Sequence, residues 1–296
     1  MKKSIGVFLV VLFCTLALVA CSSGPKDLTK GKTPEKIVEE SFAKWYELDS
    51  YDLDLNSQIK MSLGQQVMDM SMTGTISAFQ NPLKMKMVMD VAIPGMNEKV
   101  AMEQYMVEEE QKVIIYQQVQ GMWQKMTIDD PAMLELMSMD PRENLKLFMD
   151  NLTEAEILGE ETIGDKVTVK IKIVASGKIF EDIFQDMAGT SLGISDDIFD
   201  TELLSQLGDM EYLIWIEKST LETVKCQMDL TETMRNLGSA LAAKISEPEM
   251  AELQELFSTM EMSLEYTVFN QNNVQDFTIP EEAKNAQEIT LPSTGA

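Results

Sequence analysis

The chain has 296 residues, a formal net charge of −25 and 45% hydrophobic residues, which together predict a folded protein with a strongly acidic surface. Such a surface repels phosphate backbones and anionic lipid headgroups, so we expect no nucleic-acid partner. The sequence contains no histidine, which excludes Ser-His-Asp and Cys-His catalysis and the common zinc sites. Acidic residues are abundant, but no carboxylate pair stands out as a hydrolase site. We therefore expect neither an enzyme nor a protein that holds a cofactor or a metal.

The first residues carry the pattern of an export signal. Two lysines precede an apolar run of 14 residues, Ile5–Leu18. A membrane-spanning helix needs about 20 apolar residues, so the pattern is typical of a signal peptide over residues 1–20. The run ends in Leu18-Val19-Ala20-Cys21, which resembles the lipobox of bacterial lipoproteins. That resemblance implies cleavage before Cys21 and a diacylglyceryl group on its sulfur, with fatty acyl chains such as palmitate.

A lipid on Cys21 would hold the protein on the extracytoplasmic face of the cell membrane. Two acyl chains suffice for stable residence in a bilayer, whereas one chain is marginal. Residues 21–33 are mostly polar or small and include two glycines, which predicts a flexible tether between lipid and domain. The membrane is therefore an expected partner through the lipid, and the sequence does not identify any protein partner.

Cys226 is the single thiol that remains free once the leader is removed and Cys21 is modified. An intramolecular disulfide is therefore excluded. Val224, Met228 and Leu230 alternate with polar residues around it, which places Cys226 on the apolar face of a strand. The pattern favours a small buried hydrophobe over a redox group.

A helix and a series of strands open the domain. Thr33 and Pro34 form a helix start, and apolar residues then recur at helical spacing as far as Leu48. From Tyr51 the apolar period changes to two, which predicts strands. Short turns between the runs predict an antiparallel meander with one dry and one wet face. The expected strands cover about 51–63, 68–76, 83–93, 99–107, 112–118 and 122–127.

Helical and strand patterns alternate in the second half of the chain. Helical stretches are expected near 131–139, 141–150, 178–188, 197–207 and 233–257. Strands are expected as a pair over 154–175, and at 211–217, 222–231 and 260–269. No linker interrupts this pattern, so we expect a single domain over 34–283.

Residues 284–296 form a polar C-terminal tail in this interpretation. It contains Leu291-Pro292-Ser293-Thr294-Gly295, which matches the five-residue sortase motif. A sortase signal also needs an apolar stretch and a basic tail after the motif, and neither follows here. We expect the match to be a coincidence.

The layout resembles the superfamily of LolA- and LolB-like carriers and LppX- and LprG-like lipoproteins, and it is most similar to Gram-positive lipoproteins within that group. The lipobox, the strand end Trp123-Gln124-Lys125 and the following Asp130-Pro131 carry the resemblance. It implies an α+β fold in which an antiparallel sheet curls into a half-barrel and helices lie over its concave face. The resemblance does not identify individual ligand-contacting residues in this sequence.

Methionine is unusually frequent. Of 24 methionines, fifteen fall between positions 61 and 139. Valine or isoleucine would form strands better, so methionine in these strands indicates a benefit other than strand propensity. Three interpretations stay open: a methionine-heavy core, an adaptable apolar cavity, or a thioether site for Cu(I). The Cu(I) site lacks support from a histidine or a second cysteine. The candidate cavity lining is two triplets with alternate spacing, Met68, Met70, Met72, Met85, Met87 and Met89.

Two acidic clusters are the other candidates for a metal site. They are Asp49, Asp52 and Asp54, and Asp196, Asp197 and Asp200. Calcium needs a loop that converges several oxygens, often around a glycine, and neither cluster has that form. We expect both to be solvated surface.

The sequence thus favours a non-catalytic lipoprotein that binds or carries an apolar ligand, most simply a lipid. The segments 131–150 and 178–207 would act as lids over the methionine-rich strand faces. The alternative is a structural or protein-interaction lipoprotein whose interior is filled by its own side chains at normal density. A cavity between helices and sheet would favour the carrier.

Overall fold

The structure is a computed structural model that describes residues 26–64, 66–95, 99–110, 112–119, 121–129, 141–178, 205–244 and 249–289. Cys21 and the leader lie outside the described residues, as do 131–140 and 179–204, which hold most of the two expected lids. Among the described residues, no helix has the length and apolar character that crossing a bilayer requires.

The expected first helix is present as α2 (Pro34–Tyr46). The hydroxyl of Thr33 accepts a hydrogen bond from the amide of Lys36 at 3.4 Å, and Pro34 occupies the first helical position. Both features stabilise a helix start, because the first amides of a helix have no partner within it. Ile37 and Val38 are fully buried on the side of the helix that faces the sheet.

The described strands form one twelve-stranded sheet with the order β12-β6-β5-β4-β3-β2-β1-β11-β10-β9-β8-β7. Every neighbouring pair is antiparallel except β12 and β6, which are parallel, so the sheet is mixed. The strands are β1 (Ser50–Leu63), β2 (Gln66–Phe79), β3 (Lys84–Ala92), β4 (Val100–Glu109), β5 (Lys112–Val119), β6 (Met122–Ile128), β7 (Leu152–Ile163), β8 (Lys166–Ala175), β9 (Met210–Glu217), β10 (Thr223–Asp229), β11 (Glu261–Phe269) and β12 (Gln287–Glu288).

Strand β11 joins the two halves of the chain. Strands β1 to β6 form one meander and β7 to β10 another, and β11 pairs with β1 on one side and with β10 on the other. The expected strands are therefore present, and they share a single sheet. The helix expected over 233–257 is two helices, α7 (Thr231–Lys244) and α8 (Glu249–Ser258).

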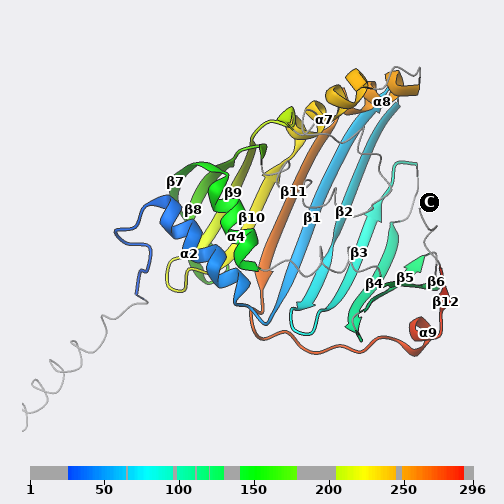
Figure 1. The fold of residues 1–296 in the computed structure, drawn as a ribbon, viewed down its shortest axis with the longest axis horizontal. Helices are drawn as coiled ribbons and strands as arrows, with labels where there is room; N and C mark the ends of the chain where they lie inside the picture. Colours follow the sequence, from blue (N-terminus) through cyan, green and yellow to red (C-terminus); the bar gives the residue numbers. More distant parts are fainter. Residues whose placement is uncertain are drawn as a thin grey trace, which may run out of the picture.

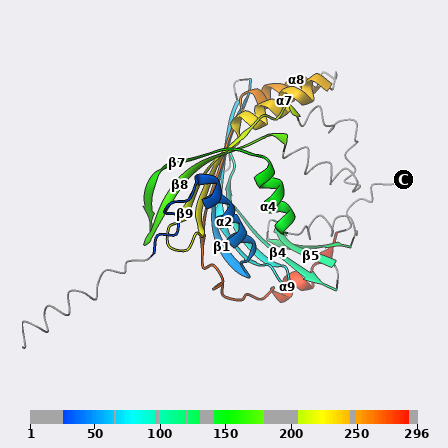
Figure 2. The same ribbon diagram turned by 60° about the vertical axis from the view of Figure 1, so that its left-hand side comes forward.

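Helices lie on one face and at one end of the sheet. Figures 1 and 2 show α2 and α4 (Pro141–Asp150) side by side over the strands β7 to β10, while α7 and α8 lie at the far end of β11 and β1. A short helix, α9 (Glu281–Lys284), contacts β5 and β6. The expectation of a large, mostly antiparallel sheet with helices over one face is met in outline by α2 and α4, whereas α9 lies against the opposite face. The edge strands β12 and β7 do not pair with each other, so the sheet is open, and its curling into a half-barrel stays a prediction.

The register of the strands sorts their side chains onto two faces, because directly paired residues point to the same side. One continuous row runs Ile171, Ile214, Cys226, Tyr266, Leu55, Gly74 and Met89, from β8 to β3. We call the side that carries this row the apolar face. The opposite, polar face carries alternating Lys, Glu, Asp and Thr residues such as Lys172, Glu211, Lys225 and Glu265.

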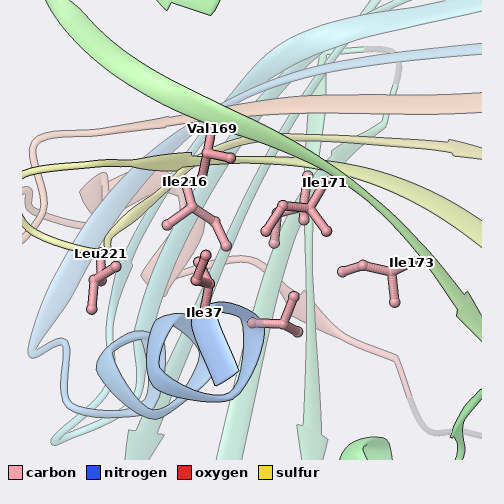
Figure 3. Close-up of a cluster of buried hydrophobic side chains, with 8 residues drawn as sticks. Ile37, Val169, Ile171, Ile173, Ile216 and Leu221 are labelled. Carbon is pink, nitrogen blue, oxygen red and sulfur yellow. The ribbon is translucent and has the colours of Figure 1, made fainter. Parts of the chain in front are cut away.

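The main core lies where α2 covers the apolar face. Figure 3 shows Ile37 of α2 pointing toward Val169 and Ile216 of the sheet, with Ile171, Ile173 and Leu221 around them. Ile37, Ile171 and Ile216 have no exposed surface. Burial of such side chains contributes roughly 1.5–3 kcal/mol each, which holds α2 against the sheet.

The polar face has a smaller core of its own beneath the C-terminal segment. Tyr105, Val107 and Tyr116 of β4 and β5 are buried against Ala283 of α9, with Phe277 packed alongside. The amide of Ile289 then donates to the carbonyl of Lys125 at 2.7 Å. The segment 270–289 is therefore fixed to the sheet, and this includes the start of the tail expected from residue 284.

Candidate apolar binding site

A cavity of about 220 Å³ lies between the helices α2 and α4 and the apolar face. Its walls come from two helices and four strands that are distant in the sequence. The lining residues are Phe42, Tyr46, Phe148, Ile173, Tyr212, Ile214, Cys226, Met228 and Tyr266.

The helical wall of the cavity is aromatic. Phe42 and Tyr46 are one turn apart on α2, so both project from the same side of the helix. Phe148 of α4 meets Phe42 with ring centroids 4.6 Å apart and meets Tyr212 of β9 edge-on at 6.3 Å. These ring contacts fix the spacing between the two helices and the sheet.

The sheet supplies the floor of the cavity through its register. Ile173 pairs with Tyr212 and Tyr212 pairs with Met228, which makes one row across β8, β9 and β10. Ile214, Cys226 and Tyr266 form the next row, two residues along the strands. The alternation that put these residues on one face therefore also gathers them under the helices.

None of the described lining residues carries a charge. Burial raises the pKa of Tyr212 to about 12 and raises the pKa values of Tyr46 and Tyr266 above their ordinary range. Burial also raises the pKa of the Cys226 thiol to about 11, despite a hydrogen bond with Tyr266 that lowers it. All four groups are neutral at physiological pH, so the cavity favours uncharged, apolar chemistry.

The prediction for Cys226 is confirmed: the side chain is 6% exposed and lies on the apolar face. A buried thiol with a raised pKa is a poor nucleophile, because the thiolate is the reactive form. The structure therefore gives Cys226 the role of a small hydrophobe in the cavity wall.

The six predicted methionines lie on the apolar face, on β2 and β3, which are separated from the cavity floor by β1. Met70 and Met72 pair with Ile59 and Ser57 of β1, and the β3 triplet pairs with β2 in the order Met85–Ala78, Met87–Ile76 and Met89–Gly74. Met68 pairs with Met61. Five of the six are half-buried, whereas Met89 is 3% exposed. The described cavity itself is lined by Met228 and by none of the six, so their role as a ligand lining stays a prediction.

Gly74 explains why Met89 is buried. A Cβ atom added at Gly74 would lie 2.6 Å from Met89 Sδ and 2.1 Å from the Val88 carbonyl oxygen. The missing side chain leaves room for the thioether of Met89, which fills the space as a core residue would.

Of the expected lids, the described part of the chain shows α4, which covers the cavity through Phe148. The aromatic residues were missed as a site because each belongs to an ordinary amphipathic or alternating pattern. A usable signal existed in the alternation of Met210, Tyr212, Ile214 and Ile216, which places a tyrosine on the apolar face of a strand.

The first acidic cluster is divided by the sheet. Asp49 and Asp54 are exposed, as expected, but Asp52 is only 9% exposed. Its Oδ2 accepts a hydrogen bond from Asn270 Nδ2 at 2.7 Å, so the interpretation of Asp52 as a solvated surface group is wrong. Among the described residues, no three His, Cys, Asp or Glu side chains converge as metal ligands. The second acidic cluster, at 196–200, lies outside the described residues, and the thioether site for Cu(I) stays an untested alternative.

A second depression lies on the polar face, near α7. It has a volume of about 650 Å³ and a mixed lining that includes Lys60, Asp69, Asp229, Arg235 and Glu261. The charges of both signs lie on exposed side chains around an open groove, and Arg235 Nε is engaged by the carbonyl oxygen of Met260 at 3.1 Å. We regard the apolar cavity as the candidate site.

Residues 33–288 match a family described as a family of unknown function, DUF6612. None of the curated proteins matches the chain. Solved structures with a similar course of the chain include lipoprotein LppX of Mycobacterium tuberculosis, 11% identical, with a TM-score of 0.43 over 82% of this chain and 96% of that one. LprF from Mycobacterium bovis is 13% identical, with a TM-score of 0.41 over 84% and 97%.

A lipoprotein-sorting domain from Vibrio parahaemolyticus is 7% identical, with a TM-score of 0.25 over 85% of this chain and 97% of that one. LppX is one of the lipoproteins whose superfamily the sequence layout resembles. The likeness concerns the course of the chain, and no ligand or role is carried over from it.

Proposed function

The chain belongs to the DUF6612 family, and we propose that it is a lipoprotein, anchored through Cys21 on the extracytoplasmic face of the cell membrane, that binds an apolar ligand such as a lipid. The ligand would occupy the cavity beneath α2 and α4 and extend over the methionine-rich strands. The sheet would curl around it as a half-barrel within a single domain over 34–283. The observation that carries the proposal is an uncharged cavity whose floor shares rows of paired residues with the methionine-rich part of the apolar face.

Continuity along the face matters because of the cavity's size. Sites for drug-sized ligands usually measure roughly 300–1,000 Å³, and the cavity measures about 220 Å³. A long apolar ligand would therefore have to leave the cavity along the face. Tyr266 in its wall is followed in the same row by Leu55, Gly74 and Met89.

The chemistry of this path fits a flexible apolar ligand. Methionine side chains are unbranched and polarizable, so they repack around different shapes at low cost. Affinity would come from apolar burial, at about 25 cal/mol per Å² removed from water. Since the lining offers no cation, an anionic headgroup would have to stay outside the cavity.

Ligand binding can be tested with residues 22–296 made without the lipid. The purified protein would be extracted into organic solvent for mass spectrometry, and a second sample titrated with the neutral fluorophore N-phenyl-1-naphthylamine. We expect a co-purifying lipid or a saturable rise in fluorescence. Repeated absence of both would refute the carrier and favour a filled interior.

A matched pair of substitutions locates the site. Met228→Trp places a large side chain in the cavity wall, whereas Met122→Trp places it on a 65% exposed position of β6. We expect the first variant to lose lipid and fluorophore and the second to keep them, with both folded by circular dichroism. Equal binding by the two variants would place the ligand elsewhere.

A further inference from the structure

The segment that precedes α2 is docked on the domain. The amide of Leu28 donates to the carbonyl oxygen of Lys218 at 2.7 Å, and the Asp27 carboxylate lies 3.1 Å from Lys218 Nζ. The amide and hydroxyl of Thr29 donate to Asp27 at 2.9 and 2.6 Å. Leu28 also packs against the main core. Residues 27–33, which the sequence assigned to a flexible tether, are therefore packed on the domain.

Docking makes the link to Cys21 short. Asp27 lies six positions after Cys21 in the sequence, and a fully extended chain spans at most about 3.6 Å per residue, or roughly 20 Å here. The point of docking is at one end of the sheet. Lys218 opens the turn between β9 and β10, and its amide donates to Val167, next to the turn between β7 and β8.

The opposite end of the sheet is far from this point. Strand β1 starts near the docked end, where Asn272 donates to Ser50, and finishes near α8, where the hydroxyl of Thr259 donates to Ser62. Its 14 residues span about 45 Å at the usual rise of a strand. Figures 1 and 2 both show the start of the described chain and the α7–α8 pair at opposite ends of the molecule.

The segment that precedes α2 differs in charge from the rest of the chain. Residues 26–36 contain four lysines and two acidic residues, in a chain with a net charge of −25. Lys26 and Lys30 are exposed, whereas Lys32 and Lys36 form ion pairs with Glu40 and Glu39 of α2. An anionic membrane surface attracts such a segment and repels the remaining acidic surface, so both forces favour the same orientation.

From these observations we infer that the protein stands on the membrane in one orientation, with the end formed by residues 26–33 and the turns at 164–165 and 218–222 toward the lipid surface. The inference rests on the proposed anchor at Cys21. The α7–α8 end points away from the bilayer. The two floor rows of the cavity lie five and seven positions along β8 from Lys166, through Ile171 (the partner of Ile214) and Ile173. The cavity is therefore held roughly 16–23 Å above that end.

The orientation is tested with the full, lipidated chain in vesicles that contain phosphatidylglycerol and a lipid with a nitroxide on its headgroup. In a Cys226→Ala background, a fluorophore is attached to Asp165→Cys, at the turn between β7 and β8, or to Ser258→Cys, at the end of α8. Both positions are exposed. We expect severalfold stronger quenching at position 165 than at position 258.

Two further variants test the cause. An insertion of about 20 Gly and Ser residues between Gly24 and Pro25 leaves all docking contacts in place but adds roughly 25 Å of reach, and it should weaken the quenching at position 165. The double variant Asp27→Ala, Leu28→Gly frees the docked segment and should do the same. Strong quenching at position 165 that survives both changes would refute docking as the cause.

The outcomes separate the inference from its premise. Protein that fails to sediment with vesicles would refute the anchor at Cys21. Protein that sediments but shows equal quenching at both positions, or more at position 258, would refute the orientation alone. Ligand binding in the apolar cavity is measured on protein without the lipid anchor, so neither the sedimentation nor the quenching result bears on it.

Discussion

Cys226 shows at the scale of one residue how the cavity controls chemistry. Its thiol is 6% exposed, and burial raises its pKa to about 11. At pH 8 we expect it to react with a thiol reagent about two orders of magnitude more slowly than an ordinary cysteine, because the thiolate is that much rarer. In a Cys21→Ser protein without the leader, Cys226 is the single thiol, so absorbance with Ellman's reagent measures it directly.

Two controls accompany this measurement. The rate should rise about tenfold per pH unit as the pH approaches 11, since each unit multiplies the thiolate fraction. In denaturant, reaction should be fast and complete. Rapid stoichiometric reaction of the native protein at pH 8 would contradict the buried position.

Single residues also show where sequence patterns reach their limit. The alternation around Cys226 predicted its burial, because a period of two records which face of a strand is dry. Asp52 has the same pattern as its exposed neighbour Asp54, yet it is buried by its partner Asn270, 218 residues away. A contact between such distant residues leaves no local signal, so the sequence could not distinguish the two.

At the scale of elements, the α7–α8 pair depends on the absence of one side chain. A Cβ atom at Gly238 of α7 would lie 2.0 Å from Phe257 Cβ of α8. Alanine is the better helix former by about 1 kcal/mol, but here the helices would have to separate. We expect Gly238→Ala to lower the free energy of unfolding by about 1–3 kcal/mol, measured by urea denaturation.

The next residue supplies the control for this substitution. Ser239 is exposed and donates to the carbonyl of Arg235 one turn earlier. Ser239→Ala improves helix propensity without a clash, so stability should stay within about 0.5 kcal/mol or rise. If both substitutions stabilised the protein equally, the close approach of the two helices would be excluded.

The helices and the strand order were harder to predict than the strands. The helical pattern over 233–257 indicated one helix, so the boundary between α7 and α8 was not predicted. Pro248 directly precedes α8, and prolines commonly mark helix starts. The apolar period predicted β11 but not its place between β1 and β10, because pairing across about 200 residues depends on the whole sheet. An apolar cavity under helices was expected, but its lining was not predicted, because six elements contribute to its wall and the six candidate methionines lie outside it.

At the scale of the molecule, the absence of histidine and the buried tyrosines set the response to pH. Burial raises the pKa of Cys226 from 9.0 to about 11 and that of Tyr212 from 10.0 to about 12, and it also raises those of Tyr266, Tyr46 and Tyr51. The folded state keeps these protons at a pH where the unfolded chain has lost them. Stability is therefore fully present below about pH 9 and falls as the pH rises toward 12.

We accordingly expect the free energy of unfolding to be nearly constant from pH 6 to pH 8, where histidine would otherwise titrate. By pH 10 it should have fallen by about 2 kcal/mol, mostly through Cys226. Urea denaturation followed by circular dichroism across this range measures the change. General charge repulsion acts in the same direction, because the chain already carries −25.

The variant Cys226→Ala separates the two causes. It removes the thiol but leaves the net charge at neutral pH unchanged, so repulsion predicts the same alkaline loss as in the unmodified protein. Desolvation of the thiol predicts a loss smaller by about 1 kcal/mol between pH 8 and pH 10. An identical alkaline loss in the two proteins would mean that the cavity admits water to Cys226, and that would also weaken the case for a dry, apolar ligand site.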